Sequence, residues 1–264
     1  MSSTAPPPTL PPTPLTLPEA LRSLGLRRTA ADLADFLARA TRSRWSPAVL
    51  LEERVRAEAQ DRAQRSLERR LSRARLGAFK PIADFEWDWP KALDRDAVER
   101  VLALSFLESG HNVILAAAQG LGKTMLAKNV AHQAVLRGAH VLYVTAADLL
   151  LDLGGQETAR TLERRLRHYA EPRLLAIDEV GYLTYDNRAA DLLFQVVSRR
   201  YERRSILLTT NLAFKEWGTI FPNAACVTAL IDRLTHHAEI ISIAGESYRR
   251  REAEAAQKAR RGKS

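Results

Sequence analysis

The 264-residue sequence contains a single cysteine, Cys226, and few aromatic residues, which make up 6% of the chain. One cysteine excludes an intrachain disulfide, and it excludes a metal site built from several thiolates. This cysteine usage is compatible with a reducing cytoplasm. The simplest role for Cys226 is that of a small buried apolar side chain.

Long hydrophobic runs are also missing. No run approaches the roughly 20 apolar residues that are needed to cross a bilayer. Residues 5–18 (APPPTLPPTPLTLP) carry prolines where a secretory signal needs a basic start and an apolar stretch. We therefore expect a soluble cytoplasmic protein without a membrane partner. Residues 1–17 are expected to form a disordered Pro-rich arm, either a plain linker or a ligand for a polyproline-binding groove.

Positive charge is concentrated at the two ends of the chain. The net charge is +9, from 40 Lys/Arg and 31 Asp/Glu. Residues 1–80 hold 15 basic and 8 acidic residues, and residues 246–264 hold 7 and 3, which leaves −2 for residues 81–245. Each basic cluster alone is compatible with a solvated surface. Two basic ends beside a near-neutral middle favour a phosphate-rich partner, and we expect duplex DNA.

Residues 18–76 have the pattern of a small helical domain. Apolar residues recur at spacings of three and four, and Thr29 is placed to cap the second helix. A long Arg-rich helix is expected from Pro47 to Leu76. The aromatic residues between Leu76 and Pro90 mark the entry to a second domain, and they either pin a linker to a core or stack on bases.

From Leu93 onward, short apolar runs alternate with amphipathic stretches. This pattern predicts an α/β fold, a parallel sheet sandwiched between helices. The expected strands are 112–116, 140–144, 174–177, 205–210 and 240–243, and the expected helices are 123–137, 159–169, 188–203 and 226–236.

A phosphate-binding loop follows the first of these strands. The pattern G-x-x-x-x-G-K-[ST] is met except that alanine replaces the leading glycine. The predicted ATP-binding residues are Ala117, Ala118, Gln119, Gly120, Leu121, Gly122, Lys123, Thr124 and Met125. Backbone N–H groups of such a loop and of the following helix cradle phosphate oxygens. Lys123 is expected to reach the β- and γ-phosphates, and Thr124 to place its hydroxyl on Mg²⁺.

Two carboxylates end a buried strand 55 residues after Lys123, in Leu174–Glu179. Burying unpaired charge is costly, so a metal and a reacting water are the natural explanation for the acids. We expect Asp178 and Thr124 to serve Mg²⁺ and Glu179 to polarise the attacking water. The next strand, SILLTTN, ends in Thr209, Thr210 and Asn211. This polar tip is predicted to orient that water, with Asn211 as the site residue; a turn residue is the alternative.

Three segments together resemble the IstB family of AAA+ ATPases, which assist the transposases of certain bacterial insertion sequences. They are LAIDEVGYL, RAADLLFQVVSRRYERRSILLTTNLAFKEWG and LIDRLTHHAEIISIAGESYR. The resemblance spans roughly residues 18–250. It implies a P-loop AAA+ three-layer sandwich at residues 77–248, after a helical domain at 18–76 that engages DNA or the transposase, with a basic tail at 249–264.

The resemblance further implies ATP-dependent self-assembly into a homo-oligomer on DNA. Arg233 matches the family position for an arginine that completes the active site of the neighbouring subunit; an ion pair within its own chain is the alternative. Arg249 is a candidate second sensor. Two other functions stay open, a DnaC-type helicase loader, which neighbouring genes would distinguish, and a DNA-binding scaffold that barely hydrolyses ATP, which Ala117 keeps open.

Overall fold

The structure is a computed structural model that describes residues 15–89, 92–182, 185–221, 225–248 and 250–251. The arm before residue 15, Arg249 and the tail after residue 251 lie outside the described residues, and the predictions for them stay predictions. The chain divides into two compact units between Glu68 and Arg69. Each unit is described by itself.

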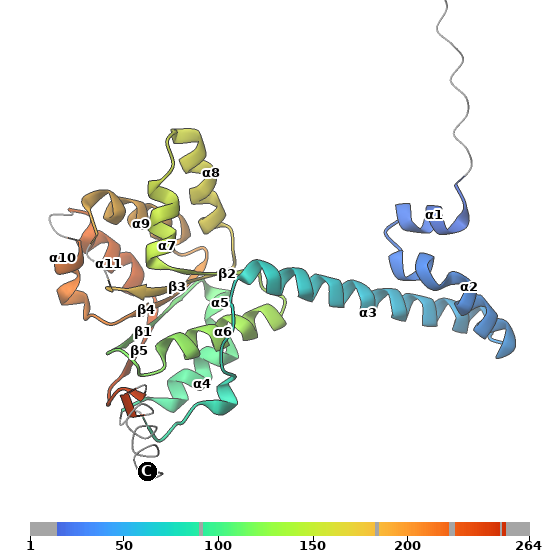
Figure 1. Cartoon of the computed structure of the whole chain (residues 1–264), viewed down its shortest axis with the longest axis horizontal. Coiled ribbons are helices and arrows are strands. Elements are labelled where there is room, and N and C mark those ends of the chain that lie inside the picture. The colour runs from blue at the N-terminus through green and yellow to red at the C-terminus, as the bar shows by residue number, and fades with distance from the viewer. Residues whose placement is uncertain (1–14, 90–91, 183–184, 222–224, 249, 252–264) are drawn as a thin grey trace, which may run out of the picture. The chain divides into compact units, whose positions relative to one another are not determined.

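The first unit consists of helices α1 (Leu17–Ser23), α2 (Arg27–Arg42) and the larger part of α3 (Pro47–Ala74) (Figure 1). Phe36 of α2 is buried and meets Trp45 edge to face at 5.8 Å. The Arg54 guanidinium lies over the Phe36 ring at 4.2 Å and donates to Asp32 Oδ1 at 2.8 Å. Arg54 therefore has a packing role within this unit.

The prediction that Thr29 caps α2 is wrong. The helix begins at Arg27, and Thr29 lies in its first turn, 5% exposed. Its backbone N–H and its hydroxyl both donate to Glu58 Oε2 on α3, at 3.0 and 3.1 Å. A carboxylate from another helix thus satisfies one of the N–H groups that a helix start leaves without an intrahelical acceptor, and this long-range contact has no signature in the local sequence.

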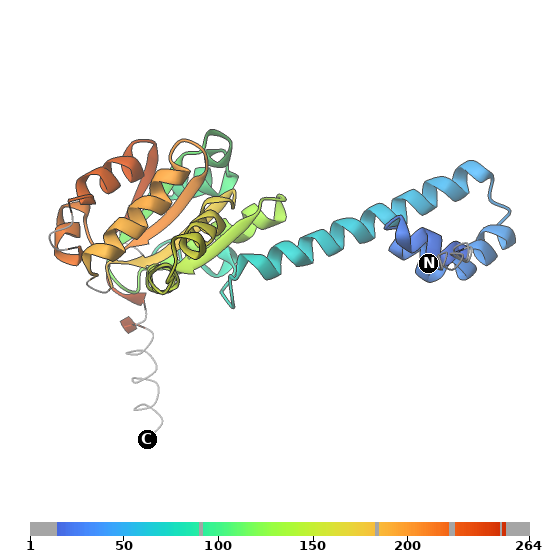
Figure 2. The ribbon, with the colours of Figure 1, turned by 90° about the horizontal axis from the view of Figure 1, so that it is seen from above.

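The second unit is built on a five-stranded parallel sheet, which confirms the predicted fold class. The strands run in the spatial order β2-β3-β4-β1-β5. They are β1 (Asn112–Ala117), β2 (Val141–Thr145), β3 (Leu174–Val180), β4 (Ser205–Thr210) and β5 (Ala238–Ile243). Each overlaps a predicted strand. The apolar runs are buried because helices cover both faces of the sheet (Figures 1 and 2).

The helices divide into two layers. One face of the sheet carries α4 (Arg95–Ala103) and α6 (Lys123–Leu136), which contact each other and the strands. The other face carries α7 (Ala146–Gly154), α8 (Ala159–Ala170), α9 (Asn187–Arg200) and α11 (Val227–Thr235). Helix α7 was not predicted, because its sequence follows β2 without a break. The short elements are η1 (Ile82–Asp84), α5 (Phe106–Ser109), η2 (Phe214–Glu216) and α10 (Trp217–Ile220).

A buried arginine at the end of α9 connects α8 to the sheet by hydrogen bonds. Arg200, at the end of α9, is 0% exposed. Its guanidinium donates to the carbonyl oxygens of Tyr169, Ala170 and Ser205 at 2.9, 3.0 and 2.6 Å. Burial lowers the pKa of Arg200 to about 9, which still leaves the side chain charged at neutral pH. Within the part of the chain that the structure describes, no helix combines the length and apolar character needed to span a membrane.

Candidate functional site

The predicted phosphate loop connects β1 to α6 at the carboxyl edge of the sheet. Gly120 and Gly122 have φ of +79° and +87°, a left-handed conformation that favours glycine. A Cβ on Gly122 would lie 2.7 Å from Phe85 Cε2, so the tight turn also depends on the missing side chain. Ala117 is the last residue of β1 and pairs with Ile243 of β5. Its backbone is extended, so alanine brings no conformational strain where the common pattern has glycine.

Lys123 begins α6 and turns its side chain back over the loop. It is 6% exposed, and its Nζ donates to the carbonyl oxygens of Ala117 and Ala118 at 2.6 and 2.8 Å. The N–H groups of the first turn of α6 point toward the same place, where a helix start favours an anion. The loop therefore brings backbone N–H donors and one ammonium group together, an arrangement that can bind an anion.

Asp178 collects three hydroxyl donors. It is 2% exposed, and its carboxylate accepts hydrogen bonds from Tyr143, from Thr209 and, at 3.3 Å, from Thr124. Thr124 and Asp178 are thus brought together as predicted. Two oxygen ligands of an octahedral Mg²⁺ with bonds of about 2.1 Å lie about 3.0 Å apart. The 3.3 Å separation and the oxygen donors fit this ion.

Tyr143 was not predicted as a site residue, and Thr209 was predicted only as part of the polar tip of the strand SILLTTN. Burial and the hydrogen bond to Asp178 raise the pKa of Tyr143, so the phenol stays a donor at neutral pH. Thr209 is 1% exposed, and its hydroxyl donates to Asp178 while it accepts from the Glu179 N–H at 2.9 Å. The available signal is a polar side chain inside each apolar strand run, VLYVT and SILLTT.

Glu179 has an unusual backbone. Its φ is +64°, and the pairing of β3 with β4 shifts register between Ile177 and Val180. A left-handed glutamate costs about 1 kcal/mol or more, and such strain is concentrated at functional sites. The bulge separates Glu179 from the buried face occupied by Asp178, and Glu179 lines the adjoining cavity. The two neighbouring acids therefore have different surroundings.

Asn211 lies next to this bulge. Its Oδ1 is buried and accepts no hydrogen bond from the described residues. A Cβ on Gly181 would lie 2.6 Å from that oxygen, so the amide packs against the turn that follows Glu179. Asn211 itself is not among the residues that line the cavity.

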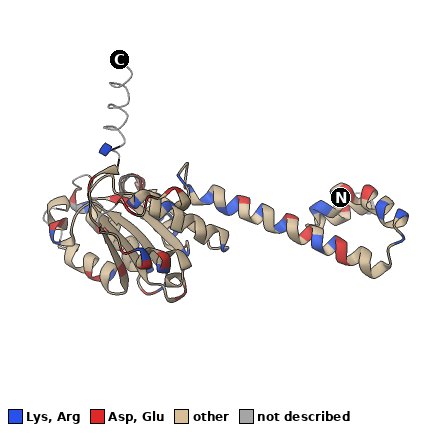
Figure 3. Ribbon diagram, turned by 90° about the horizontal axis from the view of Figure 1, so that it is seen from below, with Lys and Arg blue, Asp and Glu red and all other residues tan. Residues whose placement is uncertain are grey.

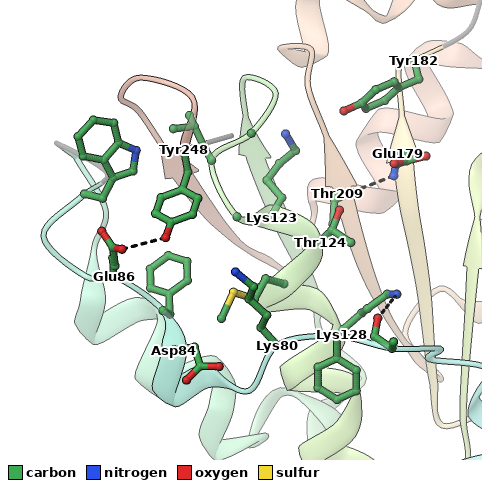
Figure 4. Close-up of a pocket in the computed structure, with 18 residues that line it drawn as sticks. Lys80, Asp84, Glu86, Lys123, Thr124, Lys128, Glu179, Tyr182, Thr209 and Tyr248 are labelled. Atoms are coloured by element: carbon green, nitrogen blue, oxygen red, sulfur yellow. Dashed lines mark hydrogen bonds between the residues drawn. The ribbon is translucent and has the colours of Figure 1, made fainter. Parts of the chain in front are cut away.

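A cavity of about 360 Å³ opens over the phosphate loop (Figure 4). Its walls combine Gly120–Met125 and Glu179 with the linker at 78–89 and with Tyr182 and Tyr248. The linker is fixed at both ends, since Phe79 meets His132 edge to face at 5.4 Å and Trp89 Nε1 donates to Glu246 O at 2.9 Å.

The segment after β5 closes one side of this cavity. Tyr248 N donates to Gly120 O and Tyr248 Oη donates to Glu86 Oε1, both at 2.9 Å. Neither Glu86 nor Tyr248 was predicted, because each reaches the cavity through a contact between distant parts of the chain.

Arg233 lies elsewhere. It is near the end of α11, its guanidinium is over the Phe194 ring at 4.6 Å, and no carboxylate of the described residues lies within 4.0 Å of it. Two residues, His236 and His237, connect α11 to β5. His237 O accepts from Asn112 N at 2.8 Å, so the end of α11 lies near the first residue of β1. The phosphate loop follows the other end of β1, roughly 17 Å along the strand. Arg233 is thus not brought to the loop of its own chain.

Comparisons with known proteins agree with this architecture. The model of the family described as IstB-like ATP binding protein matches residues 19–256. A relative from Pseudomonas aeruginosa, an ATP-binding protein of insertion sequence IS21, is 39% identical over 72% of this chain and 72% of its own. Another, of insertion sequence IS5376 in Geobacillus stearothermophilus, is 37% identical over 75% and 79%. The crystal structure of DnaI aligns with a TM-score of 0.52 at 18% identity, over 64% of this chain and 92% of that chain.

Proposed function

We propose that this chain, which belongs to the family of IstB-like ATP-binding proteins, is an ATPase that assembles on duplex DNA and assists a transposase. The observation that carries the enzymatic part is the arrangement at the end of β3. One buried carboxylate, Asp178, meets the loop hydroxyl of Thr124, while a neighbouring carboxylate, Glu179, is turned into the cavity. A protein that only holds nucleotide has no need of the strained second acid.

ATP binding is assigned to the phosphate loop. The backbone N–H groups of 118–124 and the ammonium of Lys123 would contact the phosphates, and Lys123 would exchange its carbonyl partners for phosphate oxygens. The cavity continues from the loop to the linker at 78–89, which leaves room for the nucleoside. Thr124 and Asp178 would hold Mg²⁺, which neutralises charge that develops on the phosphates.

Glu179 is the proposed general base. As a water oxygen attacks the γ-phosphorus, Glu179 accepts a proton from that water, and the bond to the β-γ bridging oxygen breaks to release ADP. Thr209 positions Glu179, because the Thr209 hydroxyl accepts a hydrogen bond from the Glu179 N–H and donates one to Asp178. Asn211, beside the turn at Gly181, is the proposed residue that orients the water.

Arg233 is proposed to act on the nucleotide of a neighbouring subunit. Among the described residues, Arg233 has no carboxylate within 4.0 Å; its guanidinium lies over the Phe194 ring and donates to Ala229 O at 3.5 Å, away from the phosphate loop of its own chain. A guanidinium supplied in trans stabilises charge on the γ-phosphate. ATP would then lie between two copies of the chain and favour a homo-oligomer by mass action.

DNA binding is proposed from the distribution of charge and from the relatives. Basic residues recur along α3 (Figure 3). From its middle onward the exposed ones are Arg62, Arg69 and Arg73, and the exposed Arg75 directly follows the helix. Phosphate contacts from such arginines depend little on sequence. The relatives from IS21 and IS5376 are proteins of insertion sequences, and a transposase is the partner proposed from them.

Steady-state ATP hydrolysis, measured with and without duplex DNA, tests the proposal. We expect turnover that depends on Mg²⁺ and rises with DNA, because DNA aligns subunits and so completes shared sites. Glu179→Gln should lose turnover, and its matched control is Glu99→Gln, the same chemical change at an exposed acid of α4 that does not line the cavity. It should hydrolyse ATP as the unchanged chain does. A chain that binds ATP but shows no turnover under either condition would be a scaffold, and the proposed function would fail.

A further inference from the structure

Two histidines and a glutamate gather at the edge of the sheet opposite the phosphate loop. They are His236 and His237, between α11 and β5, and Glu202, in the turn after α9. Glu202 Oε1 lies 3.6 Å from His237 Nε2 and 3.9 Å from His236 Nδ1. All three ligand atoms lie within 4.8 Å of one another. The ATPase mechanism above makes no use of this cluster.

We propose that Glu202, His236 and His237 bind a transition-metal dication, with Zn²⁺ as the best match. Tetrahedral zinc with bonds of about 2.0–2.2 Å places its ligand atoms about 3.3–3.6 Å apart. The Glu202–His237 distance already meets this spacing, and the Glu202–His236 distance exceeds it by a few tenths of an ångström. Two imidazoles with one carboxylate suit Zn²⁺ and neighbouring metals, whereas Mg²⁺ and Ca²⁺ prefer oxygen ligands alone.

The backbone around the two histidines is fixed. His236 N donates to Asp232 O at 2.9 Å, which continues the helical bonding of α11. His237 O accepts from Asn112 N at 2.8 Å, which joins the start of β5 to β1. The His237 ring also stacks on His111, with centroids 5.2 Å apart and planes 12° apart. Adjacent residues are thereby held with their rings 3.9 Å apart.

Glu202 is held by its turn. Its φ is +57°, and the N–H groups of Arg203 and Arg204 both donate to Arg200 O at 2.9 Å. Gly110, whose φ of +71° favours glycine, lies beside this turn, where a Cβ would be in ordinary contact at 3.5 Å with the backbone of Glu202 and Arg203. The Glu202 carboxylate is therefore carried by a short turn that backbone hydrogen bonds hold in place.

One side of the cluster is open to solvent. The three side chains are 45–56% exposed, so water can complete the coordination of the metal. Tyr201 Oη lies 2.5 Å from His236 Nδ1, and it must give up that contact when the nitrogen binds metal. Arg233 lines the same hollow as Glu202 and His237. Its positive charge and the loss of the tyrosine contact make this site weaker than a closed structural zinc site.

Calorimetric titration of the full chain with Zn²⁺ tests the proposal. The protein should carry no polyhistidine tag, and millimolar Mg²⁺ without ATP should occupy the oxygen ligands at Thr124 and Asp178. We expect one Zn²⁺ per chain, and a loss of at least about tenfold in affinity in Glu202→Gln and in His237→Gln. His132→Gln is the matched control, because His132 packs against Phe79 in another part of the unit, and it should bind as the unchanged chain does.

Replacement of Zn²⁺ by Co²⁺ adds a spectroscopic readout. Visible absorption typical of low-coordinate Co²⁺ with nitrogen ligands is expected in the unchanged chain and not in His237→Gln. Glu202→Gln alters an exposed side chain and tests the site even if the histidine variant folds poorly. No Zn²⁺ uptake by the unchanged chain, or uptake that Glu202→Gln leaves unaltered, would overturn the proposal. Neither readout depends on ATP hydrolysis.

Discussion

Replacing Tyr143 with phenylalanine isolates the contribution of one hydroxyl to the buried carboxylate of Asp178. The ring remains, so apolar packing in β2 is kept, and only the donor to Asp178 Oδ2 is lost. A hydrogen bond to a charged group contributes about 1.5–3 kcal/mol, and Asp178 is 2% exposed, so water cannot readily replace the donor. The expected loss in the free energy of unfolding is therefore about 1.5–3 kcal/mol, or roughly 10- to 150-fold in the folding equilibrium.

Urea unfolding in the absence of nucleotide measures this loss. The midpoint should fall while the slope with urea concentration stays constant, because the surface exposed on unfolding is unchanged. Tyr201→Phe is the matched control. Its hydroxyl contacts the exposed His236 rather than a buried carboxylate, so its effect should stay within about 0.5 kcal/mol.

A double-mutant cycle with Asp178→Asn separates the charge from the hydroxyl. In the Asp178→Asn background the acceptor is neutral, and Tyr143→Phe should cost about half as much. Equal costs in the two backgrounds, or a Tyr143→Phe effect no larger than that of Tyr201→Phe, would refute the assignment of Tyr143 as a support for Asp178.

Three further predictions concern activity and DNA. Glu179→Gln should retain ATP binding and lose about 10²–10⁴-fold in turnover, since an amide cannot accept the proton; unchanged turnover in a steady-state assay contradicts the role of this acid. Arg233→Ala and Lys123→Ala should each hydrolyse ATP poorly, yet their mixture should recover activity at interfaces that pair an intact loop with an intact arginine. Mixed oligomers without recovery would make the arginine structural. Replacing the exposed arginines of 54–75 with glutamine and removing 249–263 should weaken DNA binding and flatten its salt dependence; an unchanged salt slope in a filter-binding titration counts against the charge argument.

The sequence predicted those parts of the site that local pattern determines. A phosphate loop needs glycines and a lysine at fixed spacing, and Asp178 and Glu179 end an apolar run, so both could be located without the structure. Whether alanine can replace the leading glycine of the loop could not be predicted from the sequence. The structure shows that it can, because Ala117 is the last residue of β1, where the extended backbone accommodates a side chain.

The remaining parts depend on contacts between distant segments. Tyr143 reaches Asp178 only because β2 pairs with β3 in a particular register, and that register is set by the whole sheet. The prediction that Thr29 caps α2 failed because the partner of Thr29 is Glu58 on another helix, and the local sequence does not indicate this contact. The left-handed backbone at Glu179 is equally hidden, since glutamate rarely adopts it and the bulge arises from pairing with β4.

Arg200 has a consequence for how the second unit opens. Its acceptors lie at the end of α8 and at the start of β4, so a separation of either segment leaves a buried cation with fewer acceptors. Partial detachment of α8 is therefore disfavoured, and its amide protons should exchange with solvent together with those of β4, in one cooperative opening. We therefore expect the slowly exchanging amides of this unit to include those of α8 as well as those of the sheet.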